Sequence, residues 1–198
     1  MTVFSAVFSA ILTAVIAIIL IAPALYADCA DSVTIDSVRY PVGKQWCGRK
    51  LDSVRIAEPG DLVQLPQELT YEDYRIYVRP EARDAFKSMA AAARKKGISL
   101  TADSGFRSKS FQLRLIKKRL AAGEKLPSIL RSVAPPGYSE HHTGRALDLC
   151  PSDPGFARTD IYTWLKANAA DFGFVESLPE DNPSPLHWEP WHWYYTGK

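Results

Sequence analysis

Apolar residues recur at helical spacing in three stretches of the chain. The first stretch begins at Pro80, which suits the first turn of a helix, and ends at Gly97, which favours termination. A second helix is predicted over residues 108–122 and a third over residues 159–171. Residues 124–143 contain two adjacent prolines and a glycine, and we interpret them as a long functional loop.

Short apolar runs with β-branched or aromatic residues separate the predicted helices and indicate strands. The strand candidates are residues 33–40, 61–65, 98–102, 145–149, 173–175 and 191–195. Helices and strands follow one another without a regular strand–helix–strand repeat. This order predicts the α+β fold class.

The N-terminus has the pattern of an export segment. Residues 3–22 carry no charge and are almost entirely apolar, and small residues before Asp28 would permit cleavage after Ala27. A cleaved signal peptide is the favoured interpretation. A retained membrane anchor is the alternative, because about 20 apolar residues span a bilayer. Either interpretation predicts an exported periplasmic or extracellular protein.

The composition is that of a globular protein with a core: 46% of the 198 residues are hydrophobic and 23% are charged. We expect an export segment at 1–27, a lead-in segment at 28–70 and one catalytic domain at 71–198. The net charge of +2 is too small to indicate a nucleic-acid partner.

The chain has three cysteines, Cys29, Cys47 and Cys150. In an oxidising compartment they predict one disulfide and one remaining thiol. Cys29 with Cys47 would staple the lead-in segment, whereas Cys47 with Cys150 would tie that segment to the main domain. The spacing leaves the choice open.

A candidate metal site emerges from polar residues in apolar surroundings. Asp148 lies in a predicted buried strand, where a carboxylate is costly unless a partner compensates its charge. Together with His141 and His192 it would offer two imidazoles and a carboxylate, which leave one position open, as in catalytic zinc sites. The residue types alone do not distinguish His141 from His142, or His192 from His187.

Two further residues suit hydrolytic chemistry. Glu189 lies three residues before His192, and the intervening Pro190 stiffens the link, so its carboxylate could serve as a general base. Arg107 lies in a glycine-containing loop after a predicted strand. Its guanidinium could hold a substrate carboxylate or stabilise a developing oxyanion.

Three motifs resemble the VanY-like family of zinc D-alanyl-D-alanine carboxypeptidases. Ser139-Glu-His-His-Thr-Gly-Arg-Ala-Leu-Asp148 is similar to the family signature S-x-H-x-x-G-x-A-x-D, and Glu189-Pro-Trp-His192 is similar to E-x-W-H. Upstream, Ser104-Gly-Phe-Arg-Ser108 followed by Gln112 resembles a third element of that family. The motifs occur in the family's order and cover roughly residues 74 to 197.

The resemblance implies a small antiparallel sheet flanked by helices, with a single catalytic zinc. It also implies which residues hold the metal, act as base and contact the peptide. The implied zinc ligands are His141, Asp148 and His192, the implied base is Glu189, and the implied substrate contacts are Arg107, Gln112 and Ser139. Ser104 is expected to form a turn.

The implied substrates are peptidoglycan stem peptides, and the implied reaction is removal of a terminal D-alanine. An endopeptidase that cuts within the stem or cross-bridge is an alternative, and a non-catalytic zinc-containing binding module is another. The presence of Glu189 and Arg107 favours an enzyme, which we expect to be a monomer. Family members commonly carry a basic residue in the strand after the last histidine, where this chain has Trp193-Tyr194-Tyr195. Recognition of the substrate terminus therefore stays open.

Overall fold

The computed structural model describes residues 30–197, so the predicted export segment lies outside the described residues. Within the described part, no helix is long and apolar enough to cross a membrane. The strands are β1 (Ser32–Ile35), β2 (Val38–Pro41), β3 (Val63–Gln64), β4 (Tyr77–Val78), β5 (Ala102–Ser104), β6 (Ala146–Leu149), β7 (Phe174–Glu176) and β8 (His192–Tyr195). The α-helices are α1 (Pro80–Arg94), α2 (Lys109–Ala121), α3 (Leu126–Ile129) and α4 (Asp160–Asn168), and short 3₁₀ helices join many of the elements.

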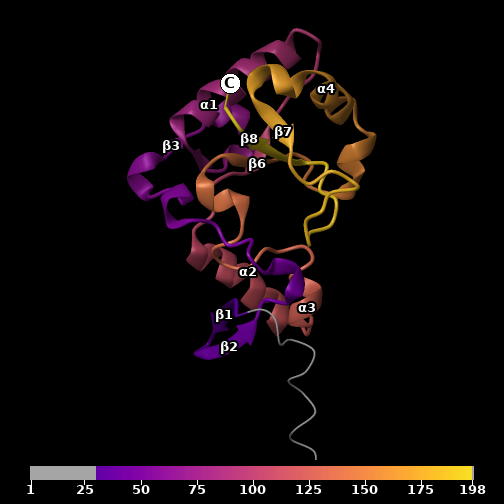
Figure 1. Ribbon diagram of the computed structural model, residues 1–198. Coiled ribbons are helices and arrows are strands. Elements are labelled where there is room, and N and C mark those ends of the chain that lie inside the picture. Colours follow the sequence, from indigo (N-terminus) through magenta and orange to yellow (C-terminus); the bar gives the residue numbers. More distant parts are fainter. Residues whose placement is uncertain (1–29, 198) are drawn as a thin grey trace, which may run out of the picture.

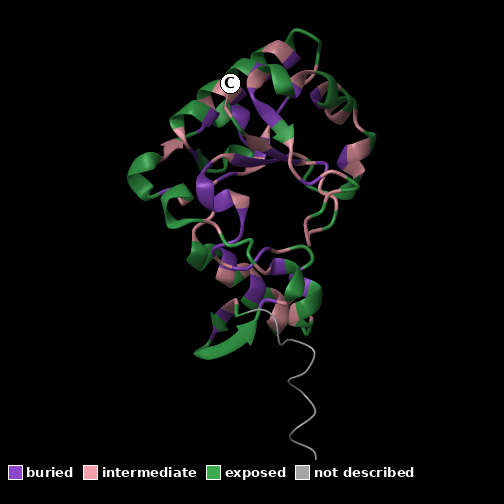
Figure 2. Ribbon diagram, viewed as in Figure 1, coloured by how far each residue is buried: buried purple, intermediate pink, exposed green. Residues whose placement is uncertain are grey.

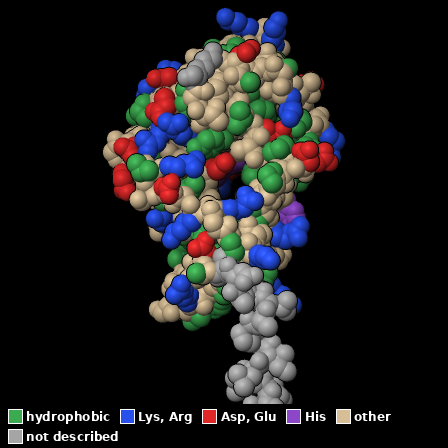
Figure 3. All heavy atoms as spheres, viewed as in Figure 1, with side chains coloured by type: hydrophobic (Ala, Val, Ile, Leu, Met, Phe, Trp, Pro, Cys, Tyr) green, Lys and Arg blue, Asp and Glu red, His purple; other side chains and the backbone are tan. Residues whose placement is uncertain are grey.

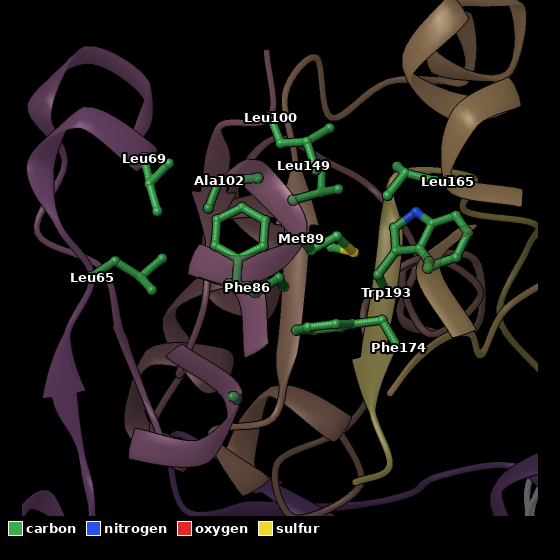
Figure 4. Close-up of a cluster of buried hydrophobic side chains, with 14 of the residues drawn as sticks. Leu65, Leu69, Phe86, Met89, Leu100, Ala102, Leu149, Leu165, Phe174 and Trp193 are labelled. Atoms are coloured by element: carbon green, nitrogen blue, oxygen red, sulfur yellow. The ribbon is translucent and has the colours of Figure 1, made fainter. Parts of the chain in front are cut away.

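A four-stranded antiparallel sheet in the order β5-β6-β8-β7 forms the centre of the upper body in Figure 1, and β1-β2 and β3-β4 are separate two-stranded sheets. Helix α1 packs against this sheet: Phe86 and Met89 lie against Leu149, Phe174 and Trp193 in one apolar cluster (Figure 4). The predicted α+β fold with a small antiparallel sheet and flanking helices is confirmed.

Helix α1 follows the apolar pattern of its sequence. Pro80 occupies its first turn, and Gly97, with φ of +75°, follows its end. Its buried residues are Ala82, Phe86, Met89, Ala90 and Ala93, which recur three or four residues apart. In α2 the buried positions are instead Gln112 and Ile116, and Ser108 caps the helix by accepting a hydrogen bond from the Phe111 amide.

A second apolar cluster lies in the lower part of the molecule, where buried segments of the lead-in meet α2 and α3 (Figure 2). Val33 and Ile35 of β1, together with Trp46, pack there with Ile116 of α2 and Ile129 of α3. The lead-in is therefore packed onto the helices and contributes to the core. Its boundary at residue 70 stays a prediction, although β3 pairs with β4 across that position.

Several predicted boundaries are wrong. The strand expected at 98–102 is shifted to β5, and the run at 33–40 bends into a hairpin between β1 and β2. Asp36 and Ser37 make that turn with φ of 48° and 66°, a left-handed conformation that neither residue type signals strongly. The loop at 124–143 also contains α3 and a 3₁₀ helix, η6 (Glu140–Thr143).

The structure decides between the two predicted cysteine pairings. Cys47 is disulfide-bonded, whereas Cys150 is a free, half-buried thiol. The pairing of Cys47 with Cys150 is therefore excluded. Cys29 lies outside the described residues, so its predicted pairing with Cys47 stays a prediction.

Candidate metal centre

Three polar side chains meet on the central sheet and the loop beside it. Asp148 of β6 lies directly opposite His192 of β8 in the antiparallel register, so their side chains share one face of the sheet. His141 comes from η6, which ends at Gly144 in the left-handed conformation and leads into β6. The fold thus brings His141 and Asp148, which belong to one sequence motif, close to His192, which lies some forty residues later in the chain.

One donor atom from each of His141, Asp148 and His192 lies within 4.8 Å of the other two, and all three residues are 3% exposed. The Nδ1 of His141 is bonded to the Gly105 carbonyl at 2.6 Å, so its Nε2 faces Asp148 Oδ2 at 3.2 Å. His192 faces Asp148 with Nδ1, 2.9 Å from Oδ1. Two imidazole nitrogens and one carboxylate oxygen in such a buried cluster fit a zinc ion with an open coordination position.

A second carboxylate, which the sequence analysis missed, supports this cluster. The Nε2 of His192 lies 2.9 Å from Oε2 of Glu140, and Ser177 Oγ donates to the same oxygen at 2.6 Å. A carboxylate behind a ligating imidazole fixes its tautomer and orientation. Glu140 occupies the unspecified position of S-x-H, and its contact with His192 depends on the three-dimensional fold.

Opposing effects set the charges in the cluster. Burial alone would raise the pKa of Asp148, but its contacts with His141, Arg107 and His192 hold that pKa well below its usual range. Burial lowers the pKa of His141 to about 4. At neutral pH Asp148 is therefore ionised and His141 is neutral, and both are forms that bind metal. Burial alone would lower the pKa of His192, but its hydrogen bonds with Asp148 and Glu140 raise that pKa to about 10, so His192 has to release a proton when it binds a metal.

Arg107 contacts the same carboxylate, at the oxygen that His141 also faces. Its Nη2 donates to Asp148 Oδ2, and its Nε donates to Ser104 Oγ at 2.9 Å. Ser104 is in β5 and pairs with Asp148 in the sheet register. The expectation that Ser104 forms a turn is therefore wrong: it is a strand residue that holds the Arg107 guanidinium in place.

Glu189 lines the same cavity as Arg107, His141 and His192. Its amide donates to the Leu178 carbonyl, and its own carbonyl accepts from the His192 amide at 2.9 Å, so a tight turn holds it beside the metal cluster. Burial raises the pKa of Glu189 to about 7. A carboxyl group with this pKa exchanges protons near neutral pH, as a general base requires.

The other residues singled out in the sequence divide into two groups. Gln112 and Ser139 line the cavity, and the buried Oε1 of Gln112 has no partner among the described residues, while its Nε2 donates to the Ala134 carbonyl. His142 faces away from the metal cluster: it is fully buried, accepts the Gly137 amide and donates to the Arg107 carbonyl. His187 is exposed and accepts a hydrogen bond from Arg131.

The cavity above the cluster has a volume of about 280 Å³. Most of its wall comes from three segments, namely residues 46–55 of the lead-in, residues 132–141 and residues 177–189, and Arg107, Gln112 and His192 complete it. The space-filling view shows the molecule hollowed on this face (Figure 3). An extended peptide could therefore reach the metal cluster from solvent.

The family model described as VanY, D-alanyl-D-alanine carboxypeptidase, matches residues 75–198, which is more than half of the chain. The chain belongs to the VanY family. The resemblance found in the sequence motifs is thereby confirmed.

The VanY-type relatives include the predicted carboxypeptidase YodJ of Bacillus subtilis (strain 168), which is 36% identical over 152 residues, covering 71% of this chain and 55% of YodJ. The structure of the LD-carboxypeptidase LdcB is similar, with a TM-score of 0.65, 30% identity and 85% of each chain covered. A mutant of the vancomycin-resistance D,D-pentapeptidase VanY in complex with Zn(II) has a TM-score of 0.54 and 25% identity, covering 68% of this chain and 83% of that one. The chain spans about half the length of the first curated relatives that it matches.

Proposed function

We propose that the protein is a zinc-dependent D,D-carboxypeptidase that removes the terminal D-alanine from peptidoglycan stem peptides. The observation that carries this proposal is the buried cluster of His141, Asp148 and His192, whose two histidines line a cavity together with Glu189 and Arg107. Family membership and the Zn(II) complex of a VanY relative support it.

His141, Asp148 and His192 would hold the zinc, and Glu140 would keep His192 oriented. When bound, zinc supplies a Lewis acid that activates water and polarises the scissile carbonyl. Glu189 takes the proton from the attacking water and delivers it to the amine of the leaving residue. The Arg107 guanidinium, which Ser104 and Asp148 hold in place, donates to the oxygen on which negative charge develops. Gln112 and Ser139 contact the peptide, and the unpartnered Oε1 of Gln112 suits a backbone amide.

A second candidate is an L,D-carboxypeptidase, because the LdcB structure covers 85% of this chain at a TM-score of 0.65. The two activities differ in the configuration of the residue before the scissile bond. Among the cavity contacts of residues 30–197, none specifically favours an endopeptidase or a non-catalytic module.

Mass spectrometry of two synthetic stem peptides tests this proposal. One is a pentapeptide that ends in D-Ala-D-Ala, and the other is the tetrapeptide that lacks the last alanine. We expect the zinc-loaded protein to shorten the pentapeptide by one alanine and Glu189→Ala to lose at least about a hundredfold in rate, the range that proton transfer contributes. Shortening of the tetrapeptide alone would establish the second candidate. An unaffected rate in Glu189→Ala would remove that residue from the mechanism.

We also propose that residues 1–27 export the protein to the cell wall or its surroundings, that 28–70 form the lead-in and that 71–198 form the peptidase domain. The substrate class and the apolar run at residues 3–22 support export. Expression in a bacterial host followed by mass spectrometry of the intact product is the direct test. A mass that corresponds to residues 28–198 indicates cleavage after Ala27, whereas the uncleaved mass in the membrane fraction indicates an anchor.

A further inference from the structure

Two arginines of the lead-in segment, Arg49 and Arg55, line the cavity above the metal cluster. Both precede residues 75–198, which the family model matches. We propose that they form a carboxylate-binding subsite for the peptide substrate. This inference rests on the proposed function and adds to it a preference for acidic stem peptides.

Backbone hydrogen bonds hold this part of the lead-in against the metal-binding loop. The Leu51 amide donates to the Gly137 carbonyl at 2.9 Å, and the Ala57 amide donates to the His142 carbonyl at 2.8 Å. Arg55 lies between these two anchors. The segment 51–57 therefore runs beside the segment that carries Ser139 and His141, and its position depends on the same loop as the metal site.

Arg49 reaches the opposite wall of the cavity. Its Nη2 donates to the Pro183 carbonyl at 2.8 Å, which connects the lead-in to the 177–189 loop. Both Arg49 and Pro183 line the cavity. The remaining N–H groups of this guanidinium have no other hydrogen-bond partner among the described residues, so they can donate to a ligand.

The positive charge of the two arginines is not neutralised within the described structure. Neither guanidinium takes part in any ion pair among residues 30–197. The third arginine of the cavity, Arg107, is paired with Asp148, and the acidic Glu140 is bonded to His192 and Ser177. Arg49 and Arg55 are exposed residues that line the cavity, and guanidinium groups without an ion-pair partner match carboxylates, which they bind with paired, charge-assisted hydrogen bonds.

The carboxylates of a peptide substrate need a cationic partner, and the residues that follow His192 in strand β8 do not supply one. In β8 the residue after His192 is Trp193, which is 2% exposed and packed in the core, and two tyrosines follow. A stem peptide carries a carboxylate at its C-terminus and others on its acidic side chains. Arg49 and Arg55 are placed to bind one of these groups, and the peptide that carries it should be preferred over its amide.

Calorimetric binding of three peptides distinguishes these carboxylates. The full-length, zinc-loaded Glu189→Ala protein would be titrated with the unmodified pentapeptide, with a form amidated on its side-chain carboxylates, and with a form amidated at its C-terminus. We expect one of the two amidations to weaken binding about tenfold, the size of one charge-assisted contact. When Arg55→Gln or Arg49→Gln is added to the Glu189→Ala protein, this double variant should bind the unmodified peptide about as weakly as the Glu189→Ala protein binds the amidated peptide with reduced affinity. The amidation that has this effect identifies the carboxylate.

Lys44→Gln provides a matched control, because Lys44 is an exposed cation of the same segment that does not line the cavity. It should leave all three affinities unchanged. Equal affinities for the three peptides, or an amidation effect that persists in both arginine variants, would overturn the inference. Turnover of the unmodified peptide by the wild-type protein is measured alongside. Its absence together with an arginine-dependent amidation effect would count against the proposed reaction and support the subsite.

Discussion

A carboxylate outside the three candidate ligands is in contact with the cluster. Glu140 accepts from His192 Nε2, so that Nδ1 of the same ring faces Asp148. Removal of such a partner weakens metal binding because the imidazole loses both its fixed orientation and part of its basicity.

Substitution of Glu140 by glutamine should therefore weaken zinc binding about 10- to 100-fold, the usual effect of removing an outer carboxylate. Competition with a chromophoric chelator measures this change. Glu124→Gln is the matched control, since its carboxylate pairs with Arg119 and does not line the cavity. An unchanged zinc affinity in Glu140→Gln would show that Ser177 and the sheet hold His192 without the carboxylate.

The individual residues of the site were largely predictable because the motifs name them. His141, Asp148 and His192 do cluster, and Arg107 and Glu189 line the same cavity. The contacts of Glu140 and Arg55 were not predictable, because the partners are far apart in the sequence and neither residue type is unusual in its local context. The three-dimensional fold alone brings Glu140 and Arg55 to the residues and the cavity that they contact.

At the scale of elements, the turn between η6 and β6 positions two of the three candidate ligands. Gly144 has φ of +68°, and a Cβ atom there would lie 2.7 Å from Leu62 Cδ2. A side chain at this position would be strained by its backbone conformation and would also displace the Leu62 side chain.

Gly144→Ala should lower the free energy of unfolding by about 2 kcal/mol or more, since the strain of about 1 kcal/mol for a left-handed alanine is increased by the steric contact. Gly123→Ala is the matched control: it has φ of +86° but an open surrounding, so it should show the backbone strain alone. Urea unfolding of the metal-free proteins compares the two. Equal losses in both variants would mean that the contact with Leu62 relaxes without cost.

Helices were easier to predict than strands for a physical reason. The ends of α1 and α2 carry local signals, namely a first-turn proline, a serine cap and terminal glycines, and the predicted ends are correct to within a few residues. The position of β5 depends on pairing with β6, which lies more than forty residues away. Alternation within residues 98–102 could not reveal that register.

At the scale of the whole molecule, the second apolar cluster forms part of the cavity wall through Trp46, Ala134 and Tyr138. Trp46 of the lead-in is 3% exposed and lies in the second cluster, where its Nε1 donates to the Leu130 carbonyl and its ring contacts Tyr138 edge-on. Tyr138 precedes Ser139 and the metal-binding loop directly. The packing of the lead-in therefore supports the same loop that holds His141.

The packing of the lead-in against the metal-binding loop predicts one cooperative unfolding transition for the described part of the chain. Trp46→Ala should lower its free energy of unfolding by about 3–5 kcal/mol through the cavity that it leaves. Trp46→Phe should cost about 1–3 kcal/mol, because it keeps the aromatic ring but leaves the Leu130 carbonyl without its donor. Urea unfolding followed by far-UV circular dichroism and by tryptophan fluorescence measures both losses. Coincident transitions are expected from the two probes. A separate early transition in Trp46→Ala would show that the lead-in unfolds independently, and the metal-binding loop would then owe its shape to the central sheet alone.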